Sequence, residues 1–145
     1  MIYRRRGEEG RAAEALHNAA DRIRSSTKEP KAQAGLLLNH AAALLQTGNP
    51  KEALRVLDDM ILPHKEELQG DPSYFTAWNL KANILYQQKE FAGAAEAFAA
   101  LLHAAQAAGA LTQQQSVICR NCSKMYALAG NGEQARAYEA MAETL

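Results

Sequence analysis

Residues 37–60, LLNHAAALLQTGNPKEALRVLDDM, decide the fold of this chain. Apolar and small residues recur there at spacings of three and four, which places their side chains on one face of a helix. Gly48 favours the positive φ that ends a helix, and Pro50 suits the first position of the next one, where its missing N–H costs nothing. Asn49 and Glu52 are predicted to form a capping box there. The stretch therefore predicts a helical hairpin.

The same hairpin recurs along the chain at a constant interval, which we call the repeat step. On the second helix of each hairpin this step relates four alanines: Ala12, Ala53, Ala94 and Ala135. On the first helix it relates a bulky column, a small column and a second large column: Leu37, Trp78 and Cys119; Ala41, Ala82 and Ser123; Leu44, Leu85 and Tyr126. Small residues at one level let two helices cross closely. A single hairpin cannot bury its apolar face alone, so neighbouring hairpins must cover it.

The helix signals divide the chain into seven predicted helices. They span residues 8–25, 31–46, 50–63, 72–88, 91–108, 112–129 and 133–144, the last one following a Gly130-Asn131-Gly132 turn. Pro63 is expected to end or kink the third helix, and Thr112 to cap the sixth. This predicts one domain, residues 1–145, with a half repeat at 1–26 and repeats at about 31–70, 72–109 and 112–145. The chain is expected to open inside a repeat, either as a piece of a longer protein or as a natural truncation.

Composition favours an all-α fold. Alanine is abundant and β-branched residues are scarce, which favours helix over strand. Sixteen basic and sixteen acidic residues cancel, so no global field predicts nucleic acid as a partner. The chain has no apolar run long enough to span a bilayer and no apolar signal stretch near its start, so we expect no membrane association and a cytoplasmic location.

The columns and turns resemble those of the tetratricopeptide repeat (TPR) superfamily. Residues 37–60 follow its pattern nearly throughout, residues 78–101 follow it without the turn glycine, and residues 119–142 follow it with Cys119 and Glu139 at usually apolar positions. The repeat step is longer than the usual TPR period. The resemblance implies a right-handed superhelix of antiparallel helix hairpins, whose first helices line a concave face that receives an extended peptide or a partner helix.

The predicted peptide-binding residues are polar or apolar side chains on the first helices, away from the packing columns. They are Leu38, Asn39, Asn79, Asn83, Tyr86, Arg120, Asn121 and Lys124. Four residues separate Asn79 from Asn83 and Arg120 from Lys124, so each pair shares a helix face. Two amides beside two cations suit a carboxylate, and the set resembles the carboxylate clamp of some TPR domains. The alternative is a solvated helix surface without a ligand.

Other motifs favour a non-catalytic protein without a cofactor. Cys119 and Cys122 form a C-x-x-C inside a predicted helix, where buried thiols are a better interpretation than a redox pair. The four histidines show no paired spacing for zinc, so no metal is expected. No phosphate loop or hydrolase motif occurs.

We therefore expect a protein-interaction module that binds a protein or peptide partner in the concave groove. The alternatives are a fragment of a larger TPR scaffold or signalling regulator, and a structural assembly domain that self-associates through its terminal helices. In that last case the final helix, which contains Met141 and has no capping helix after it, makes the contact.

Overall fold

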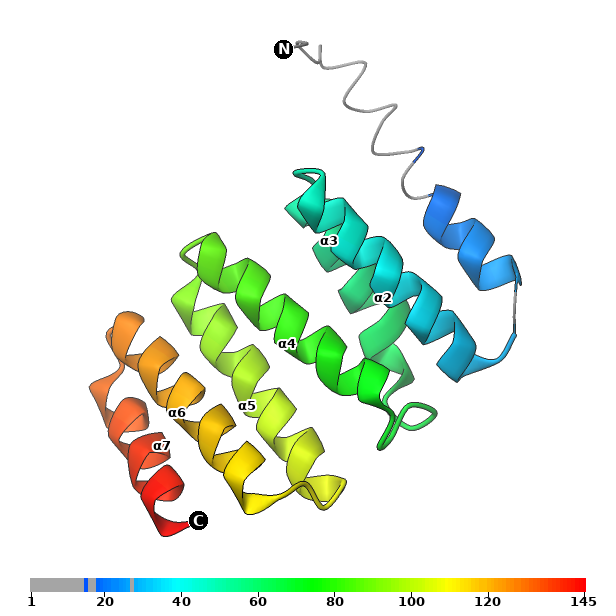
Figure 1. Ribbon diagram of the computed structural model, residues 1–145. Helices are drawn as coiled ribbons and strands as arrows, with labels where there is room; N and C mark the ends of the chain where they lie inside the picture. Colours follow the sequence, from blue (N-terminus) through cyan, green and yellow to red (C-terminus); the bar gives the residue numbers. More distant parts are fainter. Residues whose placement is uncertain (1–14, 16–17, 27) are drawn as a thin grey trace. The chain divides into compact units, whose positions relative to one another are not determined.

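The computed structural model describes residue 15, residues 18–26 and residues 28–145 (Figure 1). Every regular element in these ranges is helical, with no strand among them, which confirms the all-α prediction. Residues 18–26 are helical, as expected for the end of the predicted helix 8–25. Ala12, which belongs to the alanine column, lies outside the described residues.

Contacts between residues divide the chain into two compact units, Met1–His64 and Lys65–Leu145. The first holds residues 18–26, α2 (Pro30–Gln46), α3 (Pro50–Val56), the π-helical turn η1 (Leu57–Ile61) and the 3₁₀ turn η2 (Leu62–His64). The second holds α4 (Pro72–Gln87), α5 (Phe91–Ala107), α6 (Thr112–Leu128) and α7 (Gly132–Thr144). Most helix ends lie within one residue of the predicted ones. The right-handed superhelix of the whole chain stays a prediction.

The helix that begins at Pro50 changes its winding before it ends. The N–H of Leu62 donates to the carbonyl oxygen of Leu57, five residues earlier, and a 3₁₀ turn containing Pro63 follows. Proline has no N–H to donate to the carbonyl four residues back, so the α-helical ladder cannot continue through it. The prediction that Pro63 ends or kinks this helix is confirmed, although the regular α-helix already stops at Val56 and Pro63 lies inside the last 3₁₀ turn.

Three turns of the repeat have the same backbone. Gly48, Lys89 and Gly130, which the repeat step relates, have φ of 81°, 62° and 83°. In each turn the following N–H donates over 2.8 Å to a carbonyl oxygen five residues back; for Lys89 this bond runs from Glu90 to Leu85. Such a bond closes a helix end whose next residue is left-handed. The turn without glycine therefore keeps the geometry of the repeat, with a lysine in the left-handed region.

Two predicted helix caps are wrong. Asn49 directly precedes α3, but its side chain accepts no hydrogen bond from that helix, and its Nδ2 instead donates to the hydroxyl of Thr47 at 3.0 Å. Glu52 forms an ion pair with Arg55 at 3.2 Å in place of a capping box. Thr112 is already the first helical residue of α6, so its side chain does not occupy the cap position.

The repeat columns form the cores of both units. Leu37, Ala41 and Ala53 have no exposed surface in the first unit. In the second unit α5 lies between α4 and α6 and contributes most of the buried side chains (Figure 1). Its core consists of Ala82 from α4, Ala94, Ala95, Ala97, Phe98 and Leu101 from α5, and Cys122 and Met125 from α6. Small residues on α5 let the flanking helices approach closely, which fixes the faces that α4 and α6 turn to solvent.

Candidate peptide-binding surface

Each first helix of the second unit exposes one stripe of side chains. On α4 the exposed residues Thr76, Asn79, Asn83 and Tyr86 follow spacings of three and four, and we call them the α4 stripe. On α6 the corresponding α6 stripe consists of Val117, Arg120, Lys124 and Leu128. Spacings of three and four place the members of each stripe on one face of their helix. The repeat step relates Asn79 to Arg120 and Asn83 to Lys124, so the two stripes occupy the same face of successive hairpins.

The charged members of the α6 stripe have no counter-charge within the described part of the chain. Neither Arg120 nor Lys124 forms an ion pair with a carboxylate there, and both side chains are exposed. The amides of Asn79 and Asn83 are likewise exposed and make no hydrogen bond to a described residue. Their donors are therefore available to an anionic group that approaches from solvent.

Tyr86 supplies an aromatic surface at the end of the α4 stripe. The residue is 42% exposed, and its ring packs against Phe91 of α5 with the ring centroids 5.9 Å apart and the planes inclined by 57°. This tilted contact across the turn between α4 and α5 limits the orientations of the Tyr86 side chain. One face of the ring is thereby braced while the rest of it remains accessible.

Three of the eight predicted residues lie away from the stripes. Leu38 is the repeat equivalent of Asn79 and Arg120, but it is half-buried and belongs to the first unit. Asn39, also in the first unit, is exposed and equivalent to Asn121, which is half-buried and sits one position beside the α6 stripe. Consecutive helical residues point about 100° apart, so the side chains of Asn39 and Asn121 leave their helices in a different direction from the stripe residues next to them.

Sequence reasoning missed apolar members of these exposed faces. Val117 and Leu128 are 56% and 48% exposed on the α6 stripe, and Leu36 on α2 is 47% exposed. Each lies three or four positions from a predicted residue: Val117 from Arg120, Leu128 from Lys124, and Leu36 from Asn39. Extending the helical spacing beyond the polar residues would have found them. The α6 stripe thus places two cations between two apolar side chains.

The second unit also contains an apolar pocket of about 380 Å³. Its walls come from the loop before α4, α4 itself, α5, the loop after α5 and the start of α6: Gly70, Phe75, Leu101, Ala105, Ala108, Ala110, Gln114 and Ile118. Gln114 is the one polar side chain among them. A pocket of this composition offers burial of an apolar group and no acid–base chemistry.

The two thiols of the C-x-x-C belong to the core. Cys119 and Cys122 are free and fully buried. Burial raises the pKa of both thiols, and the neighbouring Cys119 further contributes to raising that of Cys122 to about 12. A thiol with so high a pKa carries almost no thiolate near neutrality and is a poor nucleophile. Both residues act here as small apolar side chains.

The described residues offer neither a cluster of metal ligands nor a membrane-spanning helix. No group of three or more His, Cys, Asp or Glu side chains in residues 15, 18–26 and 28–145 is arranged to hold a metal ion. No helix within the same ranges is long and apolar enough to cross a membrane.

Comparison with protein-family models, with curated proteins and with solved structures finds no match to this chain. The resemblance to the TPR superfamily is carried by the columns and turns alone, and it stays a prediction.

Proposed function

We propose that this chain is a non-catalytic, TPR-like interaction domain that binds an acidic extended peptide or partner helix through the α4 and α6 stripes. The observation that carries the proposal is the exposure of Arg120 and Lys124 without a carboxylate partner among the described residues. Exposed cations that no described carboxylate neutralises can serve a ligand, and the repeat step puts the amides of Asn79 and Asn83 at equivalent positions.

The chemistry of the stripes suits a carboxylate flanked by apolar side chains. The guanidinium of Arg120 can donate two parallel hydrogen bonds to a carboxylate, and Lys124 adds a point charge one helical turn away. The amides of Asn79 and Asn83 can donate to peptide carbonyl groups without needing a counter-charge. Tyr86, Val117 and Leu128 offer apolar contacts.

The remaining predicted residues extend this surface in the proposed architecture. In the right-handed superhelix that the TPR resemblance implies, the first helices of all hairpins line one concave face. Leu38 and Asn39 of α2 would then continue the groove, and Asn121 would border it. A cytoplasmic protein or peptide is the proposed partner.

The test uses short labelled peptides that are rich in Asp and Glu, each made with a free and with an amidated C-terminus. Fluorescence polarisation measures their affinity for the whole chain. The double variant Arg120→Gln, Lys124→Gln is expected to weaken binding by about tenfold or more, because a hydrogen bond to a charged group contributes roughly 1.5–3 kcal/mol. Amidation should weaken binding only if the terminal carboxylate is the bound group.

The matched control removes two other exposed cations of the same unit. Lys65 and Arg136 are exposed and lie off both stripes, so Lys65→Gln, Arg136→Gln changes the net charge equally. The control is expected to bind like the unaltered chain. An equal loss of affinity in both double variants would show non-specific attraction, and no loss in the first would remove the stripes from the proposal.

A second candidate function is self-association, which exposed apolar side chains of the last hairpin support. Met141 on α7 is 38% exposed, and Leu128 at the end of α6 is 48% exposed. Light scattering over a concentration series is expected to show a mass above 15.8 kDa, and Met141→Glu should restore that of the single chain. A single-chain mass at every concentration would contradict this candidate.

A further inference from the structure

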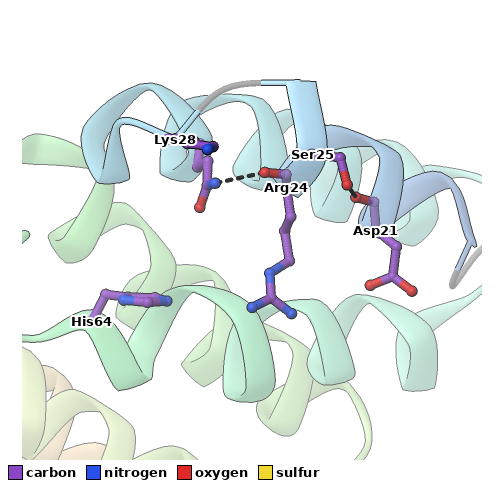
Figure 2. A pocket seen from close by; sticks show the side chains of 6 residues that line it. Asp21, Arg24, Ser25, Lys28 and His64 are labelled. Carbon is purple, nitrogen blue, oxygen red and sulfur yellow. Dashed lines mark hydrogen bonds between the residues drawn. The ribbon is translucent and has the colours of Figure 1, made fainter.

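A polar pocket of about 540 Å³ lies within the first unit (Figure 2). Its walls come from the helical residues 18–26, the linker after them, the first turns of α2 and the 3₁₀ turn η2. The lining residues are Asp21, Arg24, Ser25, Lys28, Gln33 and His64. All six carry polar side chains, so the pocket differs in kind from the apolar pocket of the second unit.

Two hydrogen bonds shape the wall of this pocket. Gln33 of α2 donates from Nε2 to the carbonyl oxygen of Arg24 at 2.7 Å, which ties the end of the preceding helix to α2 across the linker. The hydroxyl of Ser25 donates to the carbonyl oxygen of Asp21 at 3.0 Å. Both donors thus act on backbone oxygens; the first bond holds the helix end that carries Arg24 beside the start of α2, and the second lies within the helix itself.

The cations of the pocket remain available. Figure 2 shows the side chain of Arg24 extending away from its helix into the pocket. Neither Arg24 nor Lys28 forms an ion pair with a carboxylate of the described chain. Set against the single carboxylate of Asp21, the two cations give the pocket one excess positive charge from these three side chains. Guanidinium and ammonium groups together supply eight N–H donors and no acceptor, which suits an oxyanion.

We propose that this pocket binds the oxyanion group, phosphate or carboxylate, of a small polar molecule. Arg24 binds two oxygens of that group through its planar fork, and Lys28 neutralises the remaining charge. The volume falls within the range of small-molecule sites, and the absence of apolar lining side chains selects a polar ligand over an apolar one. This site shares no residue with the proposed peptide-binding surface.

The test is a titration of the ¹⁵N-labelled chain, followed by its amide resonances, with inorganic phosphate in one arm and succinate in the other. Sodium chloride keeps the ionic strength constant in both arms. Saturable shifts at Arg24, Lys28 and Gln33 are expected in at least one arm, and the arm that saturates identifies the oxyanion. Shifts that rise linearly in both arms would overturn the proposal.

Two variants with the same change of charge separate the site from general attraction. Arg24→Gln is expected to weaken binding by about tenfold, because it removes a charge-assisted bidentate contact. Arg22→Gln removes an exposed arginine of the same helix that does not line the pocket, and it should bind like the unaltered chain. Arg24→Lys keeps the charge and loses the fork, so an intermediate loss is expected. Equal losses in Arg24→Gln and Arg22→Gln would overturn the site.

Discussion

The hydroxyl of Ser123 on α6 donates a 2.7 Å hydrogen bond to the carbonyl oxygen of Ala135 on α7. A side chain as short as serine can reach a neighbouring backbone only where two helices cross closely. Ser123 belongs to the small column of the first helices and Ala135 to the alanine column of the second helices. The bond therefore shows directly that the two small columns of the repeat meet in the last hairpin.

Size at position 123 should matter more than the hydrogen bond. We expect Ser123→Ala to change the free energy of unfolding by at most about 1 kcal/mol, because the earlier repeats already have alanine there and one hydrogen bond contributes about that much. Ser123→Leu should cost about 1–3 kcal/mol, since the added methylene groups push α6 and α7 apart. Urea unfolding measures both. A leucine variant as stable as the alanine variant would contradict the close crossing.

Lys89 is predicted to destabilise its turn. It has φ of 62° where the equivalent residues Gly48 and Gly130 are glycines, and a Cβ in the left-handed region costs roughly 1 kcal/mol. Lys89→Gly should therefore raise the free energy of unfolding by about that amount. Lys89→Ala loses the same charge but keeps the Cβ, so it should remain near the unaltered chain. Thermal unfolding distinguishes them, and an equal gain in both would point to charge.

The caps of α3 and α4 should respond differently to the same substitution. Asp71 accepts a 2.8 Å hydrogen bond from the N–H of Ser73, whereas Asn49 makes no side-chain cap. We expect Asp71→Ala to lower the free energy of unfolding by about 1 kcal/mol and Asn49→Ala to lower it by less. Urea unfolding of the two variants tests this. The reverse order would contradict the observed cap geometry.

The thiol of Cys122 should make stability depend on pH above 9. Its pKa rises from 9.0 to about 12 in the folded chain. Below pH 9 the Cys122 thiol is protonated in both the folded and the unfolded chain, so its contribution to the free energy of unfolding is fully present. Between pH 9 and 12 only the unfolded chain loses it, and the free energy of unfolding should fall by about 1.4 kcal/mol per pH unit. Urea unfolding in reductant from pH 8 to 11 should show a shallower fall for Cys122→Ala; equal slopes would contradict the shift.

The positions of the helices could be predicted because local signals repeat. Gly48 and Gly130 mark two turns by composition, and the repeat step locates the third at Lys89 although its residue type does not. The helix caps could not be predicted as well. Asn49 has the side chain of a cap residue but bonds to Thr47, whereas Asn131 at the equivalent turn accepts a hydrogen bond from the N–H of Gln134. The residue type alone therefore does not determine the partner.

The sequence predicted which helix face carries the candidate surface, but not which residues belong to it. The repeat register placed Asn79, Asn83, Arg120 and Lys124 away from the packing columns, and all four are exposed. It could not show that Leu38, at the same register, is half-buried, because burial depends on which neighbours cover a side chain. It also gave no sign of the pocket around Arg24.

The amino-acid sequence by itself determined the helical class, the hairpin period and the side chains that form the core, because helix periodicity and turn chemistry are local properties of the chain. The tertiary structure alone decided which polar side chains remain without a partner. Arg24 comes beside Lys28 and His64 in one pocket because elements far apart in sequence meet there. Such contacts depend on packing between elements, which a local sequence pattern does not predict.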